Sequence, residues 1–376
     1  MEPDFERSAM TLKVLMLTSN DYTGRYWRDI AKGFAGTNIK LAFASFGMTQ
    51  PPIWSDNYTY THITFNTSSK LNLFNWLQFT LRIRKFNPDV VQSHLFHGGL
   101  FGILLGKFLR IPIIYTRHHL DEHFKSGTWI HQWLDRLILR ESSRIITCSK
   151  ATKDWIISME GALPDHVAAI HQGFDFDQIV ADSNRALAIR RDIFMASEKF
   201  SILCVSRFSR VKGQIYLLDA LVKSEKLREK CKIFFIGIGD SKWLKQEINL
   251  RELNDCCSIL GASVEVLEYM QACDVVVHPS LADSFSQTII EAMGIGKCVV
   301  AANTAAVPEQ IEHGKTGLIF PQGDVDTMIK YLEILISDRF LLKKLGDSAY
   351  EAVREKFKLE DMIEQYIYEF QRTCYL

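Results

Sequence analysis

Short hydrophobic runs alternate with longer, more polar segments along nearly the whole chain. The segments between the runs, such as 26–34, 74–86 and 98–109, have helix-like patterns. Nearly continuous Val, Ile, Leu and Phe runs that alternate with helices predict a parallel sheet covered on both faces. The runs of the first half are LKVLMLTS (12–19), IKLAFASF (39–46), PDVVQSHL (88–95), IPIIYTRH (111–118), RIITCS (144–149) and VAAIHQGFD (167–175).

The same pattern restarts after a charged, strand-poor segment at 178–198. The runs of the second half are FSILCVSRF (200–208), CKIFFIGIG (231–239), CSILGA (257–262), CDVVVHPS (273–280), KCVVAAN (297–303) and TGLIF (316–320). We therefore predict an α/β fold of two Rossmann-like, doubly wound parallel-sheet domains, residues 1–185 and 186–357. Such a pair places a ligand cleft between the carboxyl ends of the strands. The amphipathic end of the chain predicts a helix at 358–376 that joins the first domain.

Composition excludes several classes of protein. The chain has 376 residues, enough for two domains, and Lys+Arg and Asp+Glu are equal at 44 each, which gives no support for general nucleic-acid binding. The eight cysteines include no C-x-x-C pair, and Cys204 and Cys298 lie in hydrophobic runs, as in a reduced cytosolic protein. The sequence MEPDFERSAM lacks the apolar region of a signal peptide, and no run reaches the roughly 18 residues of a membrane span. We expect a cytoplasmic protein, at most peripheral on the inner face of the membrane.

Two cations follow the first strand of the second half. Arg207 and Lys212 lie in SRFSRVKG, before the helix-like segment QIYLLDAL, and Gly213 allows a sharp turn there. Cations at a strand's carboxyl end suit a diphosphate. A solvated loop explains this segment equally well.

A second candidate lies in HPSLADSFSQTIIEAMGIGKCVV. This segment predicts a strand that ends at Pro279, a polar loop with Asp283, and a helix from about Gln287 to Met293. Unpaired N–H groups at a helix start favour an anion. Glu291, one turn along, is suited to two ribose hydroxyls, and Asp283 to sugar hydroxyls. The structural alternative makes Glu291 a surface helix residue.

Together these segments resemble glycosyltransferase family 4 (glycosyl transferases group 1), enzymes of the GT-B fold. The resemblance extends over nearly the full length, with the motifs in the family's order and spacing. Its motifs are SRFSRVKG, FFIGIGD, CSILGASVEVLEYMQACDVVVHPS, the segment 283–291, PEQIEHGKTGLIF, DVVQSHLFHGG, IIYTRHH, CSKATKDWI and HQGFD.

The resemblance implies a retaining transfer without a metal or other cofactor, from a UDP- or GDP-sugar to a glycan or glycolipid acceptor. The first domain would bind the acceptor and the second the donor. The acceptor would belong to a cell-surface glycan, and no protein nucleophile is needed.

The resemblance also implies roles for individual residues. Arg207 and Lys212 would hold the donor diphosphate, Glu291 the ribose, and Asp283 the transferred sugar. His118 would face that sugar, and the base would lie against 258–262 and 263–266. The further donor-binding residues would be Gly261, Val264, Phe285, Ser286, Gln287 and Thr288.

Several positions depart from the family's pattern. Asp283 stands where the family usually has Glu, Ser284 and Ser286 where it has Gly, and Ala305–Ala306 where it has Gly-Gly. Near the N-terminus only Gly24 of a usual pair is present. These departures keep a second hypothesis open, a catalytically silent sugar-nucleotide-binding partner protein. A GT-B sugar-nucleotide epimerase is a third.

Three other features have competing interpretations. Asp175-Phe176-Asp177 resembles a D-x-D metal motif, but its setting favours an interdomain segment. The histidines 94, 97, 118, 119 and 123 match no compact zinc spacing. The helix-like segment LFNWLQFTLRIRKF (73–86) is aromatic on one side and cationic at its end. We expect it to pack on the sheet, and the alternative is peripheral contact with anionic lipid, which would suit a lipid-linked acceptor.

Overall fold

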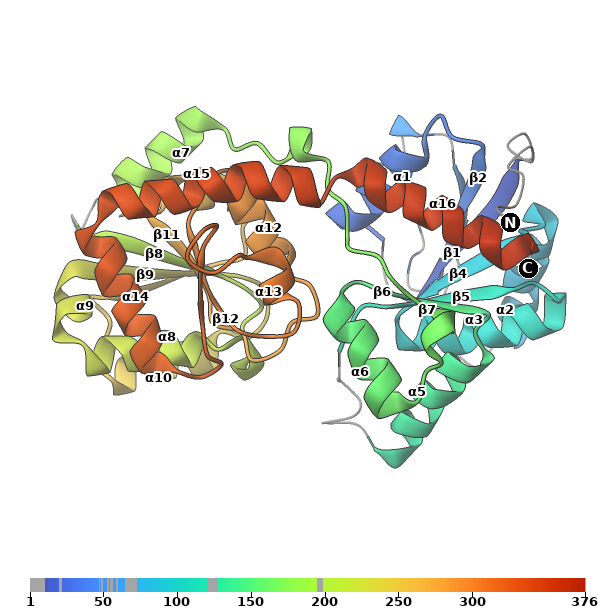
Figure 1. The fold of residues 1–376 in the computed structure, drawn as a ribbon, viewed down its shortest axis with the longest axis horizontal. Coiled ribbons are helices and arrows are strands. Elements are labelled where there is room, and N and C mark those ends of the chain that lie inside the picture. Colours follow the sequence, from blue (N-terminus) through green and yellow to red (C-terminus); the bar gives the residue numbers. More distant parts are fainter. Residues whose placement is uncertain are drawn as a thin grey trace. The chain divides into compact units, whose positions relative to one another are not determined.

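The chain folds into two compact units (Figure 1). Unit 1 comprises Met1–Phe174 and Phe357–Leu376, and unit 2 comprises Asp175–Lys356. The computed structural model describes residues 11–19, 22–46, 48, 50–52, 54, 57–58, 60–64, 73–120, 128–194 and 199–375. Within this part of the chain, no helix combines the length and the apolar character that crossing a bilayer requires.

Unit 1 is built on a seven-stranded parallel sheet with the order β3-β2-β1-β4-β5-β6-β7. Its strands are β1 (Leu12–Thr18), β2 (Ile39–Ser45), β3 (Thr61–Thr64), β4 (Val90–His94), β5 (Ile113–Arg117), β6 (Arg144–Thr147) and β7 (Val167–Ala169). Its helices are α1 (Arg25–Phe34), α2 (Leu73–Phe86), α3 (Leu95–Leu109), α5 (Trp129–Glu141), α6 (Lys150–Glu160) and α16 (Leu359–Tyr375).

Helices cover both faces of this sheet. Successive residues of β1 point to opposite faces, so its side chains enter two different cores. Val14 and Met16 enter a core shared with α1 and α16, whereas Leu15 and Leu17 enter a core shared with α2 and α3. This two-sided burial explains why the strands are continuous hydrophobic runs instead of alternating ones.

Helix α16 is fixed to unit 1 by a buried ion pair. The Arg144 guanidinium on β6 binds the Glu369 carboxylate through Nε (2.7 Å to Oε2) and through its second terminal nitrogen (2.9 Å to Oε1). The two side chains are 8% and 7% exposed. The hydroxyl of Tyr366 lies 2.9 Å from the hydroxyl of Tyr26 on α1. The last helix therefore returns to the first sheet through polar contacts as well as apolar ones.

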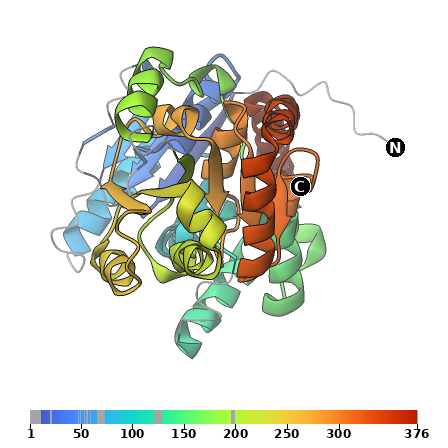
Figure 2. The same ribbon diagram turned by 90° about the vertical axis from the view of Figure 1, so that its left-hand side faces the viewer.

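Unit 2, which faces the viewer in Figure 2, is built on a six-stranded parallel sheet. Its strand order is β10-β9-β8-β11-β12-β13. Its strands are β8 (Phe200–Val205), β9 (Cys231–Ile236), β10 (Cys257–Gly261), β11 (Val275–His278), β12 (Val299–Ala302) and β13 (Leu318–Phe320). Its helices are α7 (Ser183–Ile189), α8 (Gln214–Lys223), α9 (Glu225–Lys230), α10 (Lys242–Leu250), α11 (Val266–Ala272), α12 (Gln287–Gly294), α13 (Val307–Gln310), α14 (Val325–Ser337) and α15 (Arg339–Lys356). The predicted α/β class, with two doubly wound parallel sheets, is confirmed.

The division between the units differs from the predicted one. The predicted boundary after residue 185 falls inside α7, whereas the units divide after Phe174. The charged segment around α7 belongs to unit 2 because its cations bind there. Arg185 pairs with Glu265 (Nε to Oε1, 2.7 Å), and Arg190 donates to the carbonyl of Ala272 (2.6 Å).

Truncating Glu369 to Ala should destabilise unit 1, because it leaves the Arg144 guanidinium buried without its partner. We expect the free energy of unfolding to fall by about 3 kcal/mol. The double variant Arg144→Met/Glu369→Leu, which removes both charges, should recover much of this loss. Chemical denaturation of the three proteins measures both effects, and equal stability of Glu369→Ala and the parent would contradict the assignment.

Candidate functional site

Four loops meet at the carboxyl edge of the unit 2 sheet. The loop after β8 donates from the Phe208 N–H to the Ile238 carbonyl (2.8 Å), after β9. It also accepts, at the Val211 carbonyl, the N–H of Leu281 after β11 (2.8 Å). The Gly237 N–H donates to the Gly261 carbonyl at the end of β10 (2.9 Å). Backbone hydrogen bonds therefore hold the predicted donor segments side by side.

Two glycines are required because these loops approach so closely. Gly213 has a φ of +71°, and a Cβ there would lie 1.9 Å from the Pro279 carbonyl oxygen. A Cβ on Gly237 would lie 1.8 Å from the Ser206 carbonyl oxygen. The predicted sharp turn at Gly213 is present, and this glycine also brings the Lys212 loop against the end of β11.

Lys212 and Asp283 form an ion pair at this edge. Nζ of Lys212 lies 2.9 Å from Oδ2 of Asp283, and the two side chains are 15% and 17% exposed. Nε2 of the buried His278 lies 3.1 Å from the same carboxylate oxygen. Burial alone would raise the pKa of Asp283, but the hydrogen bond and charge of His278, together with Lys212, hold it well below its usual range. Asp283 is therefore an oriented, ionised carboxylate.

His278 is a site residue that the sequence reasoning missed. It ends β11, and the run VVVH indicates a buried strand without indicating a site. The available signal was a histidine at the carboxyl end of a buried strand, five residues before an aspartate. Arg207, by contrast, is exposed and, within the described part of the chain, its side chain forms no ion pair. The structure therefore brings Lys212 and Asp283 together but leaves Arg207 outside this cluster.

Ser286 caps helix α12. Its hydroxyl accepts the N–H of Ile289 (3.4 Å), its own N–H donates to Oε1 of Gln310 (3.2 Å), and its carbonyl accepts from Nε2 of Gln310 (2.8 Å). Serine is a preferred N-cap, which gives a structural reason for its presence where the family has glycine. The N–H of Ser286 is engaged by Gln310.

The other predicted donor residues differ in exposure. Phe285 is buried, Gln287 is exposed, and Thr288 and Glu291 are partly buried on α12. Val264 is fully exposed, and Gly261 takes a left-handed φ of +79° with open space where a Cβ would stand. The open space at Gly261 and the exposed side chain of Val264 leave room for a planar ligand at the end of β10.

Ala305, three residues after the end of β12, has a φ of +31°. Positive φ is uncommon for a residue with a Cβ and costs of order 1 kcal/mol. The predicted loss of φ freedom relative to the family's Gly-Gly therefore appears as local backbone strain at the same edge of the sheet.

In unit 1, His118 follows the carboxyl end of β5 and contacts His94, which ends β4. Nδ1 of His94 lies 2.8 Å from Nε2 of His118. Burial lowers the pKa of His118 to about 4, and burial together with the charge of His118 holds the pKa of His94 well below its ordinary value. Both rings are neutral at pH 7, so one donates and the other accepts.

The turn that carries His118 is held by a buried arginine. Arg117 pairs with Asp135 on α5 (3.0 Å) and with Glu160 on α6 (2.9 Å), and its Nε donates to the carbonyl of His119 (3.0 Å). Burial raises the pKa of Glu160, and the Arg117 charge opposes that shift. His118 is thus positioned by three elements of unit 1.

Among the described residues, no group of three or more His, Cys, Asp or Glu is arranged to hold a metal ion. His123 of the predicted histidine cluster lies outside the described residues. Asp175 is buried and Asp177 is exposed at the start of unit 2.

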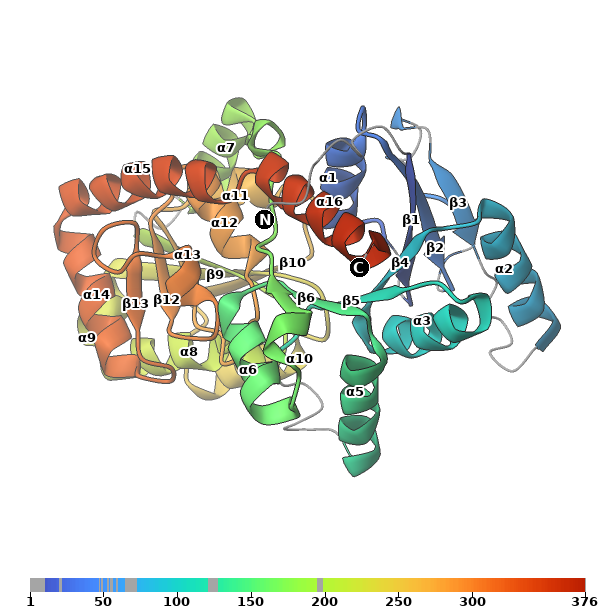
Figure 3. The same ribbon diagram turned by 45° about the vertical axis from the view of Figure 1, so that its right-hand side comes forward.

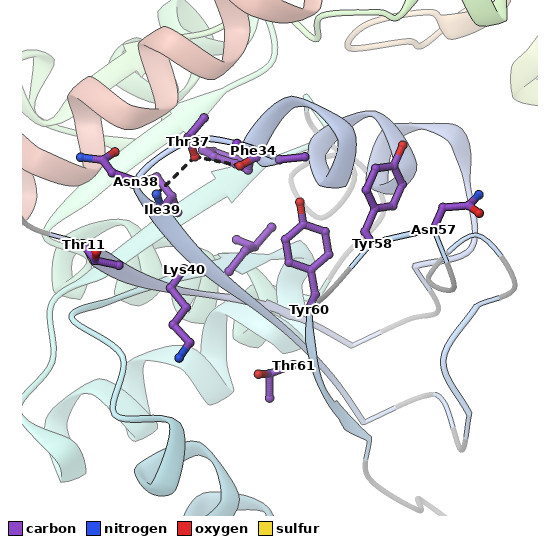
Figure 4. A pocket seen from close by; sticks show the side chains of 13 residues that line it. Thr11, Phe34, Thr37, Asn38, Ile39, Lys40, Asn57, Tyr58, Tyr60 and Thr61 are labelled. Carbon is purple, nitrogen blue, oxygen red and sulfur yellow. Dashed lines mark hydrogen bonds between the residues drawn. The ribbon is translucent and has the colours of Figure 1, made fainter.

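A hollow of about 540 Å³ lies at the opposite edge of the unit 1 sheet (Figure 4). Asn38 and Lys40 at the start of β2, and Tyr58 and Tyr60 before β3, line it. It lies at the amino ends of the strands, away from His118 at their carboxyl ends. We assign it no part in the candidate site.

Two family models match this chain. Residues 23–178 match Glycosyltransferase Family 4, and residues 187–352 match Glycosyl transferases group 1. The D-inositol 3-phosphate glycosyltransferase of Streptomyces bingchenggensis is 25% identical over 284 residues, 69% of this chain and 62% of that protein. The alpha-maltose-1-phosphate synthase of Mycolicibacterium smegmatis is 23% identical over 299 residues, 73% of this chain and 77% of that protein. The two matches account for most of the chain, which belongs to this family of glycosyltransferases.

Solved structures identify the fold as GT-B. HepE of Anabaena, solved in complex with UDP, superposes with a TM-score of 0.81 at 21% identity, covering 96% of this chain and 100% of that one. Sucrose-phosphate synthase of Thermosynechococcus elongatus superposes with a TM-score of 0.78 at 16% identity, covering 96% and 98%. The predicted family and fold are confirmed, whereas the roles of individual residues stay predictions.

The histidine pair should make unit 1 sensitive to acid. Because burial lowers the folded-state pKa of His118 from 6.5 to about 4, the unfolded chain binds the extra proton between these values. Stability should therefore fall as the pH falls through that window. Between pH 6.5 and 4, the melting temperature of His118→Gln should fall less than that of the parent. His166 is exposed, so the melting temperature of His166→Gln should fall as much as that of the parent. Identical losses in His118→Gln and the parent would refute the linkage.

Proposed function

We propose that this glycosyltransferase transfers a sugar, with retention of anomeric configuration, from a UDP- or GDP-sugar to a glycan or glycolipid acceptor. The observation that supports it most is the cluster of Lys212, Asp283 and His278 at the carboxyl edge of the unit 2 sheet. In open parallel sheets, ligands bind at this edge. A cation and an oriented carboxylate side by side match a donor that joins a diphosphate to a sugar.

Lys212 would bind the diphosphate of such a donor. Its ammonium has three N–H bonds, of which the carboxylate of Asp283 takes one at 2.9 Å and the carbonyl of Ala282 takes another at 3.4 Å. The third is available to a phosphate oxygen. Arg207, exposed on the same loop, would add a second charge when the diphosphate arrives.

Asp283 would hold the transferred sugar. Its Oδ2 atom is bound by both Lys212 and His278, so Oδ1 is left to accept a sugar hydroxyl. By binding Oδ2, His278 also fixes the direction of Oδ1. The side chain of Asp283 is one methylene shorter than the family's glutamate. Glu291 on α12 would accept the ribose hydroxyls.

The base would lie at the end of β10. The exposed Val264 offers an apolar surface, and the open space at Gly261 lets the ring approach the backbone. HepE, which shares this fold, was solved with UDP and with UDP-glucose. These observations support a nucleoside diphosphate without choosing between uracil and guanine.

We propose that the chemistry proceeds on one face of the sugar. The bond between the sugar's anomeric carbon and the diphosphate oxygen breaks, and the acceptor oxygen forms its bond on the same face. The acceptor's proton passes to the released phosphate oxygen. Lys212 and Arg207 would stabilise the charge that develops on the diphosphate, which in such reactions is a large contribution. His118, as a neutral imidazole, would hydrogen-bond the transferred sugar.

Unit 1 would bind the acceptor, and the protein would act in the cytoplasm, at most on the inner face of the membrane. A lipid-linked glycan precursor of the cell surface fits this place. The relatives differ in what their names say they act on, so the acceptor is proposed as a class.

Replacing Lys212 by Met should lower kcat by about 100-fold or more, because the leaving diphosphate loses a preorganised cation. The melting temperature should also fall, because the mostly buried Asp283 carboxylate loses this cation, so kcat is compared at a temperature where both proteins are folded. The matched control is Lys315→Met, which removes an exposed lysine of the same unit that pairs with Glu312. Steady-state kinetics on all three proteins decide the matter, and an unchanged kcat in Lys212→Met would remove this residue from the diphosphate site.

Transfer should not depend on a divalent cation, since we assign the neutralisation of the diphosphate to Lys212 and Arg207. The initial rate should be the same after dialysis against EDTA as before it. Adding Mg²⁺ or Mn²⁺ back should leave it unchanged. Loss of activity on chelation with recovery on readdition would assign that role to a metal instead.

A further inference from the structure

Helix α3 of unit 1 lies between α2 and α5, and α5 extends away from it (Figure 3). The ring of Trp76 on α2 packs against Phe101 on α3, with ring centroids 4.4 Å apart. Nζ of Lys107 on α3 lies 2.6 Å from Oε2 of Glu141 on α5. These contacts make the three helices one continuous layer, whose outer surface we call the three-helix face.

Large apolar side chains are exposed along this face. On α3, Leu104 and Phe108 are 67% and 69% exposed, and on α5, Trp129 and Trp133 are 76% and 56% exposed. In each pair the residues are four apart, so they share one outward stripe of a helix. The exposed apolar residues of the face are Leu77, Leu81, Leu104, Phe108, Trp129, Ile130 and Trp133.

Helix α2 shows how the inner and outer surfaces differ. Its aromatic residues Trp76 and Phe79 pack inward against Phe101, in agreement with the packing interpretation of the sequence. Its outer stripe instead carries Leu77 and Leu81, each about half exposed. The surface that remains open is therefore aliphatic on α2 and extends to the tryptophans of α5.

The charges on this face are almost all positive. Helices α2 and α3 contain no Asp or Glu. On α5, Asp135 is buried against Arg117, and Glu141 is bound by Lys107 and Arg140. The exposed cations are Arg82, Arg84, Lys85, Lys107, Arg110, Arg136 and Arg140. They lie toward the C-terminal ends of the three helices, a local excess in a chain whose total charge is zero.

We propose that the three-helix face docks on an anionic phospholipid bilayer. Exposed Trp, Phe and Leu side chains enter the boundary between headgroups and acyl chains, while Arg and Lys bind lipid phosphates. This proposal rests on the proposed function, because docking would bring the enzyme to a lipid-linked acceptor. The first turn of α5 lies near His118, because the ring of His131 is 5.7 Å from that of Phe96, two residues after His94, which contacts His118. A lipid-linked acceptor would therefore reach His118 from the bilayer.

The composition of the face argues against other occupants. A second copy in a symmetric dimer would bring two cationic faces together, and like charges across an interface oppose association. Nucleic acid would pair with the cations but leave Leu77, Leu81 and Leu104 unused, because nucleic-acid interfaces are polar. A bilayer uses both kinds of side chain.

Vesicle flotation with the full chain tests this proposal. We expect the protein to float with vesicles of phosphatidylcholine and phosphatidylglycerol at low salt. It should not float with phosphatidylcholine alone, and binding should weaken as salt screens the charges. Quenching of tryptophan fluorescence by brominated acyl chains should be strong in the parent and reduced in Trp129→Phe/Trp133→Phe.

The charge variant is Arg84→Glu/Lys85→Glu, and the apolar variant is Leu104→Ser/Phe108→Ser. Each cation lost from a membrane surface weakens binding by about fivefold, so the charge variant should bind the anionic vesicles at least about tenfold more weakly. The matched control is Lys242→Glu/Lys245→Glu, which makes the same charge change on exposed α10 of unit 2 and should float like the parent.

Several results would overturn the proposal. One is no flotation of the parent with anionic vesicles at low salt. Another is an equal loss of flotation in the control variant and in the charge variant. Tight binding to single-stranded RNA without vesicle binding would reassign the face to nucleic acid, and concentration-dependent dimers abolished by Leu104→Ser/Phe108→Ser would reassign it to a second copy. Nucleotide binding measured on the same proteins separates failure of this proposal from failure of the proposed function.

Discussion

The candidate donor site depends on a single carboxylate that is held from two sides. Oδ2 of Asp283 accepts from Lys212 at 2.9 Å and from the buried His278 at 3.1 Å. The Lys212 contact would not exist if the loop after β8 stood farther from the end of β11, and Gly213 allows that approach because any Cβ there would collide with Pro279. The site is thus formed jointly by the parallel strand order, two glycine positions and one ion pair. They place a cation and an ionised acceptor at the edge where a parallel sheet binds ligands.

The strands and the fold class could be predicted because burial on both faces forces continuous hydrophobic runs. Strand β3 has no such run and was not predicted. It lies at the edge of the sheet, where Thr61, His62 and Thr64 can be polar. The predicted boundary differs from the observed one because a charged segment can belong to a domain: Arg185 and Arg190 bind residues of unit 2. Local pattern predicts elements well, but it does not show which partner a charged side chain will find.

The same limit applies to the site. Lys212, Asp283 and Glu291 could be selected from sequence because residue type and position relative to strand ends indicate their chemistry. The pairing of His278 with Asp283, and of Gln310 with the backbone of Ser286, depends on how loops return through space. The exposed stripes of α3 and α5 were equally hidden, since hydrophobic residues in a predicted helix are assumed to face the core. Only the packed layer shows that Leu104, Phe108, Trp129 and Trp133 remain outside it.

The central claim is that unit 2 binds a nucleoside diphosphate through the carboxyl edge of its sheet. Calorimetric titration of UDP, GDP and ADP into the parent and into Glu291→Ala tests it most directly. We expect UDP or GDP to bind saturably and more tightly than ADP, and Glu291→Ala to bind it about tenfold or more weakly, the usual cost of losing hydrogen bonds to a charged group. Failure of all three nucleotides to bind, or identical binding by the parent and Glu291→Ala, would contradict the account.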